Sequence, residues 1–224
     1  MVNILLERYQ IDADWLFYDL QAYLHPRDRV LVIPFAFRDS RVPDLPAWKQ
    51  LYQRGTGRLW RGIVDSLGAY GMAEGRIECL NFFTETNASA REKVRAADIL
   101  YFPGGLPDRM YERLSAFDLL EPLAAHQGVV MGYSAGAVIQ LAEYHLTPDD
   151  DYPTFGYYPG IPYLHDFFVE VHYTGDAAQR SSIAKVLAER QKTVYAMHET
   201  GAIVADNGTV KLLGDVEIFS PAAR

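Results

Sequence analysis

Short apolar segments of strand length alternate with longer amphipathic segments along most of this 224-residue chain. The strand-like segments are rich in Val, Ile and Leu, as in residues 30–35 and 129–133, and the segments between them carry apolar residues at helical spacing. This alternation is typical of units in which a helix connects two neighbouring parallel strands. The sequence therefore predicts an α/β fold with a mostly parallel central sheet.

The same pattern predicts where the individual elements lie. Strands are expected at 2–6, 30–35, 77–82, 99–102, 129–133 and 167–171. Helices are expected at 15–24, 48–70 with an interruption at 55–57, 88–96, 107–120, 135–143 and 179–190. The helix at 107–120 is expected to stop before Pro122. Three closing strands at 194–197, 202–205 and 211–214 have the spacing of a β-meander, which predicts a mixed sheet. Because no linker-like stretch interrupts the chain, one domain over 1–224 is expected.

The amino-acid composition excludes several classes of function for this chain. Hydrophobic residues make up 49% of the chain and charged residues 22%, which is typical of a globular protein with a packed core. The net charge of -8 argues against a nucleic-acid partner, which would need clustered Lys and Arg. The apolar run at 2–6 is too short for a signal peptide or a membrane span, so we expect a cytoplasmic protein without a membrane partner. The single cysteine, Cys79, excludes an internal disulfide and lies in an apolar run typical of a buried strand.

The segment Gly132-Tyr133-Ser134-Ala135-Gly136-Ala137 carries the sharpest chemical signal. It lies between a predicted strand and a predicted helix, where a serine on a tight turn is lifted above the sheet edge as a nucleophile. Such a turn needs small neighbours, and the flanking glycines and alanines provide them. The alternative is a serine that only caps the helix. The context favours Ser134 as a nucleophile.

A second glycine turn, Gly104-Gly105, follows the strand predicted at 99–102 and precedes a helix. Paired glycines allow backbone N–H groups to point into a cleft, as an oxyanion hole requires. The N–H of Ala135, directly after the nucleophile, is the natural second donor. The alternative interpretation is that Gly104 and Gly105 only form a tight turn between a strand and a helix.

A serine nucleophile needs a base, and two of the six histidines are well placed for this role. His172 and His198 each follow a predicted strand, at the sheet edge where α/β proteins collect their functional groups. Local sequence does not separate the two. The other four histidines fall in loops or beside the Tyr-rich segment 152–163.

The chain resembles the peptidase E / cyanophycinase family of serine peptidases in four features that come in the same order along the sequence. They are the Phe-Pro-Gly-Gly turn at 102–105, the serine turn, His172 and the segment Met-His-Glu-Thr-Gly-Ala at 197–202. The resemblance covers nearly the whole chain. It implies a flavodoxin-like, three-layer fold related to class I glutamine amidotransferases. It also implies Ser134 as nucleophile, His172 as base, Glu199 as the acid that orients the base, and an oxyanion hole from Gly104, Gly105 and Ala135.

The acid has a competing assignment. Asp149, Asp150 and Asp151 lie between the serine and His172 in the chain, although a run of three aspartates is more often a solvated loop. Glu199 is favoured because it ends a predicted strand and would sit on a rigid scaffold.

Substrate preference is expected to differ from that of the aspartyl dipeptidases in this family. Their pattern opens the helix after the catalytic histidine with Arg-x-x-Arg, and the first Arg helps to hold the substrate aspartate. Here the similar stretch begins Gln179-Arg180. Gln179 and Arg180 are therefore the candidate substrate-binding residues, and only Arg180 is a cation. We therefore expect a small-peptide hydrolase with weak preference for an N-terminal Asp, with the Tyr-rich segment favouring apolar or aromatic residues.

Other classes of protein share parts of this pattern. A lipase-type hydrolase places its acid before its histidine in the chain, whereas the favoured acid here follows it. A glutaminase would need Cys at the position of Ser134. A non-catalytic binding module, or an amidase or esterase of different specificity on the same fold, is the remaining alternative. No metal or other cofactor is expected, and a monomer or homodimer acting on a small peptide is predicted.

Overall fold

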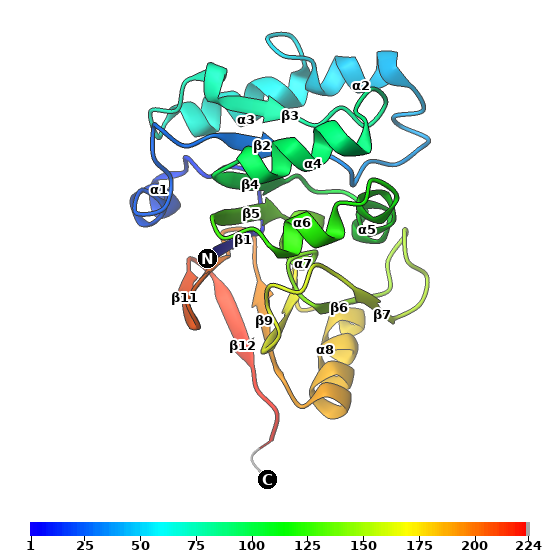
Figure 1. The fold of residues 1–224 in the computed structure, drawn as a ribbon. Helices are drawn as coiled ribbons and strands as arrows, with labels where there is room; N and C mark the ends of the chain where they lie inside the picture. The colour runs from blue at the N-terminus through cyan, green and yellow to red at the C-terminus, as the bar shows by residue number, and fades with distance from the viewer. Residues whose placement is uncertain (223–224) are drawn as a thin grey trace.

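A seven-stranded sheet lies at the centre of the computed structural model, which describes residues 1–222 (Figure 1). Its strand order is β11-β10-β1-β5-β4-β2-β3. Five neighbouring strands are parallel: β1 (Val2–Leu6), β5 (Val129–Tyr133), β4 (Ile99–Phe102), β2 (Val30–Val32) and β3 (Ile77–Cys79). The hairpin of β10 (Ala202–Asp206) and β11 (Thr209–Leu213) joins antiparallel to β1. The predicted α/β fold with a mostly parallel central sheet is confirmed.

Each face of this sheet has its own apolar core, because successive residues of a strand point to opposite faces. One core contains Ile4, Val30 and Ile99 and is covered by α1 (Asp14–Leu20), α2 (Leu45–Tyr52) and α3 (Arg58–Gly68). The other contains Leu5, Leu31 and Leu100 and is covered by α4 (Asn87–Ala96), α5 (Pro107–Ala116), α6 (Leu120–Ala124) and α7 (Ala135–Val138). The sheet and the two helical layers make the expected three-layer arrangement.

A second sheet of three strands lies below the central one in Figure 1. It contains β8 (Phe167–Glu170), β9 (Thr193–Met197) and β12 (Val216–Phe219), and α8 (Ala177–Arg190) packs against it. The predicted β-meander of the last strands is wrong. A crossover through α8 pairs β9 parallel to β8, so that β9 never joins the β10–β11 hairpin. A further hairpin, β6 (Glu143–Leu146) and β7 (Gly156–Pro159), was not predicted.

Several predicted helices are shorter than expected. The expected interruption of the stretch 48–70 is confirmed: it forms two helices, because the chain turns at 53–57, where Gly55 has a φ of 75°. The predicted helix 135–143 is one turn, and β6 starts at Glu143. As expected, the helix that begins at Pro107 stops before Pro122, at Ala116, but Pro122 itself lies in the first turn of α6, where backbone N–H groups have no intrahelical acceptor. None of the helices within residues 1–222 is long and apolar enough to cross a bilayer.

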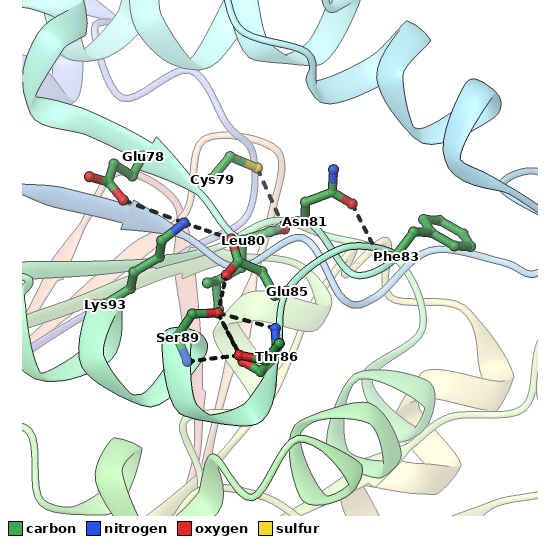
Figure 2. Close-up of polar contacts among 9 residues, drawn as sticks. All are labelled: Glu78, Cys79, Leu80, Asn81, Phe83, Glu85, Thr86, Ser89 and Lys93. Atoms are coloured by element: carbon green, nitrogen blue, oxygen red, sulfur yellow. Dashed lines mark hydrogen bonds and ion pairs between the residues drawn. The ribbon is translucent and has the colours of Figure 1, made fainter.

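Figure 2 shows how the chain passes from β3 into α4. Thr86 caps the helix, because its Oγ1 accepts the Ser89 N–H at 3.2 Å while its own N–H donates to Ser89 Oγ at 3.1 Å. Lys93 Nζ donates to Glu85 at 2.6 Å and holds the preceding loop against the helix. Cys79 ends β3, and desolvation raises the pKa of its thiol far above its ordinary value, which argues against a reactive thiolate.

Candidate active site

Ser134 lies on the turn between β5 and α7. Its backbone φ of 53° is rare for a residue with a side chain and is held by close packing, since a Cβ on Gly136 would lie 1.8 Å from the carbonyl oxygen of Phe102. The Ser134 side chain makes no capping bond to α7. Its Oγ lies 2.8 Å from Nε2 of His172 instead. The alternative of a simple helix cap is therefore rejected, and the geometry is that of a serine with a base.

The structure separates the two candidate histidines. His172 follows β8 by two residues and reaches Ser134, with its side chain 55% exposed. His198 packs edge-on against Tyr173 and lies 3.8 Å from the carboxylate of Glu217. His172 is therefore the histidine that meets the serine.

The third member of the constellation is Glu7. Its carboxylate contacts Nδ1 of His172 through one oxygen and accepts the His172 backbone N–H at 2.8 Å through the other. The Glu7 side chain is only 2% exposed. Glu7 directly follows β1, and β1 lies beside β5, so that the Ser134 N–H donates to the carbonyl of Leu6 at 3.0 Å. Strand order thus brings Glu7 to the serine and histidine.

The predicted acid, Glu199, does not lie at His172. It lies at the turn between β9 and β10, is 77% exposed and pairs with Arg8 at 3.2 Å. The place expected for it beside the imidazole is occupied by Glu7, and the expectation is corrected accordingly. Glu199 lies two residues beyond β9, in the turn that leads into β10, and its side chain is exposed to solvent beside Arg8.

The three aspartates do not contact His172 either, in the part of the chain that the structure describes. Asp149 closes its own loop by accepting the N–H groups of Asp151 and Tyr152, each at 2.8 Å. Asp151 pairs with Arg38, and Asp150 is exposed. Their loop nevertheless lines the same cavity as Ser134.

One signal in the sequence could have identified Glu7. It is a carboxylate placed directly after the first predicted strand, at the edge where parallel strands collect functional groups. What the sequence did not reveal is that this first strand neighbours the strand of the serine.

Glu7 changes the acid–base behaviour of His172. Its hydrogen bond and its negative charge raise the pKa of His172 above the ordinary 6.5, against the opposing effects of desolvation and of Arg8. When the imidazole is neutral, its Nδ1–H donates to Glu7 and its Nε2 lone pair faces the serine hydroxyl. This tautomer is the one that a general base requires.

The residues expected to form an oxyanion hole divide into two groups. Gly105 and Ala135 line the cavity beside Ser134, and their backbone N–H groups have no acceptor among the described residues. Gly105 has a φ of 142°, and a Cβ there would lie 2.2 Å from the carbonyl oxygen of Ala36, so that only glycine fits. Gly104 does not line this cavity, and a Cβ there would lie 2.7 Å from the ring of Tyr133. Gly105 and Ala135 are thus the available donors.

The two residues expected to bind substrate have other surroundings. Gln179 uses its side chain to hold the loop after β8, since Oε1 accepts the Thr174 N–H at 2.9 Å and Nε2 donates to the His172 carbonyl at 2.8 Å. Gln179 is therefore a support for His172. Arg180 is exposed, and its guanidinium lies across Gly175 rather than in the lining of the cavity.

A cavity of about 510 Å³ opens above these groups. Its lining includes Ser134 and His172, the loop of Asp149 and Tyr152, and two polar residues that sequence analysis did not single out, His145 and Glu170. Within residues 1–222, no group of three or more His, Cys, Asp or Glu side chains is arranged to hold a metal ion.

Solved structures share this fold. A protein assigned to peptidase E from Listeria monocytogenes EGD-e is similar at a TM-score of 0.62 and 20% identity, over 94% of this chain and 96% of that one. A peptidase from an acI-B1 actinobacterium is similar at a TM-score of 0.66 and 16% identity, over 98% of this chain and 90% of that one. No curated protein matches the sequence.

The sequence profile of one family matches about two thirds of the chain. Residues 63–213 match peptidase family S51, a segment that contains Ser134 and His172 but begins after Glu7. The resemblance inferred from the serine turn and the glycine turn is thereby confirmed. This chain belongs to peptidase family S51.

Proposed function

We propose that this protein is a serine peptidase that hydrolyses small peptides through an acyl-enzyme on Ser134, with His172 as general base and Glu7 as the residue that orients it. The observation that carries the proposal is the 2.8 Å contact between Ser134 Oγ and His172 Nε2, on an imidazole whose Nδ1 is held by a buried carboxylate. Membership of a peptidase family agrees with this reading.

The first half of the reaction forms the acyl-enzyme. His172 Nε2 takes the proton of the Ser134 hydroxyl while Oγ bonds to the peptide carbonyl carbon. The N–H groups of Gly105 and Ala135 would then receive the oxyanion, and each such donor contributes about 3–4 kcal/mol in acyl-transfer enzymes. The C–N bond breaks as His172 returns the proton to the leaving amine.

The second half releases the product acid. A water molecule gives a proton to His172 Nε2 and its oxygen bonds to the acyl carbon. The serine ester bond then breaks, and the proton returns to Ser134 Oγ. The Glu7 carboxylate stabilises the imidazolium that forms in each half.

The size of the site favours short substrates. A cavity of about 510 Å³ accommodates a ligand of a few residues rather than a folded chain. A dipeptide or tripeptide with its cleaved bond at Ser134 is the substrate class that we propose.

Hydrolysis of a dipeptide and tripeptide library tests the proposal. The wild-type protein should release amino acids from a subset of the library, and Ser134→Ala should lower kcat by about 10⁴-fold or more. Ser115→Ala, an exposed serine in α5, is the matched control and should keep full activity. Hydrolysis of esters alone would indicate an esterase on the same fold, and full peptide hydrolysis by Ser134→Ala would refute the nucleophile.

A further inference from the structure

A second acidic side chain stands beside the proposed catalytic histidine. Glu170 ends β8 and lies two residues before His172, and both residues line the cavity. Glu170 is 5% exposed. A carboxylate removed from water to this degree needs partners for both of its oxygens.

Only one of these oxygens has partners within the described part of the chain. Oε2 accepts a hydrogen bond from the Thr147 hydroxyl at 2.9 Å and lies 2.7 Å from Nε2 of His145. Oε1 has no hydrogen-bond partner among residues 1–222. Since Glu170 lines the cavity, Oε1 is the oxygen left for a ligand.

His145 does not cancel the charge of Glu170. Its side chain is fully buried, and its Nδ1 has no hydrogen-bond partner in the described residues. A neutral imidazole that donates through Nε2–H leaves only an acceptor unpaired at Nδ1, whereas an imidazolium would bury a second N–H without an acceptor. The hydrogen bonds of this pair are therefore best satisfied when His145 is neutral and Glu170 is a carboxylate.

The other charged groups of the cavity have partners of their own. Arg38 pairs with Asp151, Asp149 accepts two backbone N–H groups, and Asp176 caps α8 by accepting the N–H of Gln179. The lining thus holds four carboxylates and one guanidinium, and that guanidinium is already paired. A positively charged ligand group is favoured here, and an aspartate side chain is not.

We infer that Glu170 binds a positively charged amino group of the substrate, which makes it a specificity-determining residue of the proposed peptidase site. This inference rests on the proposed function. In a peptide cleaved after its first residue, the free α-amino group is two bonds from the carbonyl carbon that Ser134 attacks. The side-chain amine of an N-terminal lysine offers the same chemistry from further away.

Two substrate pairs test the inference on the wild-type protein. Leu-Leu against N-acetyl-Leu-Leu removes the α-amino charge, and Lys-Leu against norleucine-Leu removes only the side-chain charge. We expect acetylation to lower kcat/KM by at least about 100-fold, because a buried carboxylate would lose its charged partner. A loss confined to the lysine pair would assign Glu170 to the side-chain amine. Effects below about threefold in both pairs would overturn the inference without the use of any variant.

The variant Glu170→Gln assigns the effect to this residue. It keeps the shape and the acceptor for His145 but removes the charge, so the penalty of acetylation should shrink by about 10- to 100-fold. Asp150→Asn, an exposed aspartate of the neighbouring loop, is the matched control and should keep the full penalty. An unchanged penalty in Glu170→Gln would overturn the assignment.

Binding to Ser134→Ala separates this inference from the proposed chemistry. Calorimetry with Leu-Leu and N-acetyl-Leu-Leu measures the contribution of the amino group to binding affinity without any hydrolysis. Tighter binding of the free peptide that disappears in Ser134→Ala/Glu170→Gln supports the inference even if the wild-type protein cleaves no peptide. Equal binding of both peptides refutes it even if Ser134 is a nucleophile.

Discussion

Direct contact with His172, combined with burial, distinguishes Glu7 from the other carboxylates near the proposed catalytic side chains. Its side chain is 2% exposed, and both of its oxygens contact His172, one at the ring and one at the backbone N–H. A carboxylate in this setting fixes the imidazole in one orientation and one tautomer. Glu199, which is 77% exposed beside Arg8, is screened by solvent and can do neither.

The first prediction compares these two acids directly. Glu7→Gln should lower kcat/KM by about 10²- to 10⁴-fold, because the amide can no longer stabilise the imidazolium. Glu199→Gln should stay within about threefold of the wild-type value. Steady-state hydrolysis of the best library peptide measures both. The opposite ranking would restore Glu199 as the acid.

The second prediction concerns pH. His172 must be neutral to accept the serine proton, so kcat/KM should fall as pH drops through the pKa of His172, which Glu7 raises above 6.5. Glu7→Gln removes the main group that raises this pKa, leaving the smaller effect of Glu170, and the residual activity should fall off at lower pH than in the wild type. A pH–rate profile of both proteins checks the shift. An acid limb that does not move in Glu7→Gln would contradict the pairing.

The raised pKa of His172 also makes the stability of the fold depend on pH, in the direction opposite to that of activity. Because His172 binds its proton more tightly in the folded state, its pairing with Glu7 stabilises the fold fully below the unfolded pKa of about 6.5. That contribution is lost as pH rises through the raised folded value.

At the scale of elements, the turn from β5 to α7 depends on close packing of the backbone. A Cβ at Gly136 would lie 1.8 Å from the Phe102 carbonyl oxygen, on the neighbouring strand β4. The glycine therefore lets α7 begin directly against the sheet, and this contact holds Ser134 in its strained conformation.

The third prediction follows from that contact. Gly136→Ala should lower the free energy of unfolding by at least about 2 kcal/mol, since the added methyl forces β4 and α7 apart. Gly62→Ala is the matched control, because Gly62 lies in α3 with nothing within 4 Å of an added Cβ and should gain about 0.5–1 kcal/mol. Urea unfolding of both variants measures the difference. Equal stabilities would show that the turn tolerates a side chain.

The start of α8 supports the fourth prediction. Gln179 holds the loop after β8 through the Thr174 N–H and the His172 carbonyl, whereas Arg180 is exposed outside the cavity. Gln179→Ala should therefore cost about 1–3 kcal/mol of stability and lower kcat more than it raises KM. Arg180→Ala should leave kcat/KM for Asp-Leu and Leu-Leu nearly unchanged. Selective loss of Asp-Leu hydrolysis in Arg180→Ala would show that this arginine does bind an aspartate substrate.

Prediction from sequence succeeded where structure is set locally. The strands at 99–102 and 129–133 and the serine turn follow from local apolar runs and glycine spacing, and all three lie where expected. Residues 143–146 and 156–159 were not predicted as strands, because they form a hairpin through contacts with each other across an intervening loop, which local sequence does not reveal. The predicted β-meander was wrong for the same reason, because β9 pairs with β8 and not with β10, the next strand in the sequence.

At the scale of the whole molecule, the proposed site joins two sheets. Glu7 and Ser134 come from the ends of neighbouring strands of the central sheet, and His172 comes from the end of β8 in the second sheet. The contact between Ser134 and a histidine could be predicted from the glycine turn and from strand ends, but the choice of His172 over His198 came from the family resemblance. The contact of Glu7 with His172 could not be predicted, because the order of strands in a sheet is a tertiary property that periodicity does not encode. A cytoplasmic location and a monomeric or dimeric state remain predictions.

The reaction of Ser134 with a fluorophosphonate tests the central claim most directly, because the probe needs no knowledge of the natural substrate. Intact mass and peptide mapping should locate one adduct per chain on the peptide that contains Ser134. The rate of labelling should fall to background in Ser134→Ala and by at least about 10³-fold in His172→Ala. An adduct on another residue, or wild-type labelling in His172→Ala, would contradict the assignment of Ser134 and His172 as nucleophile and base.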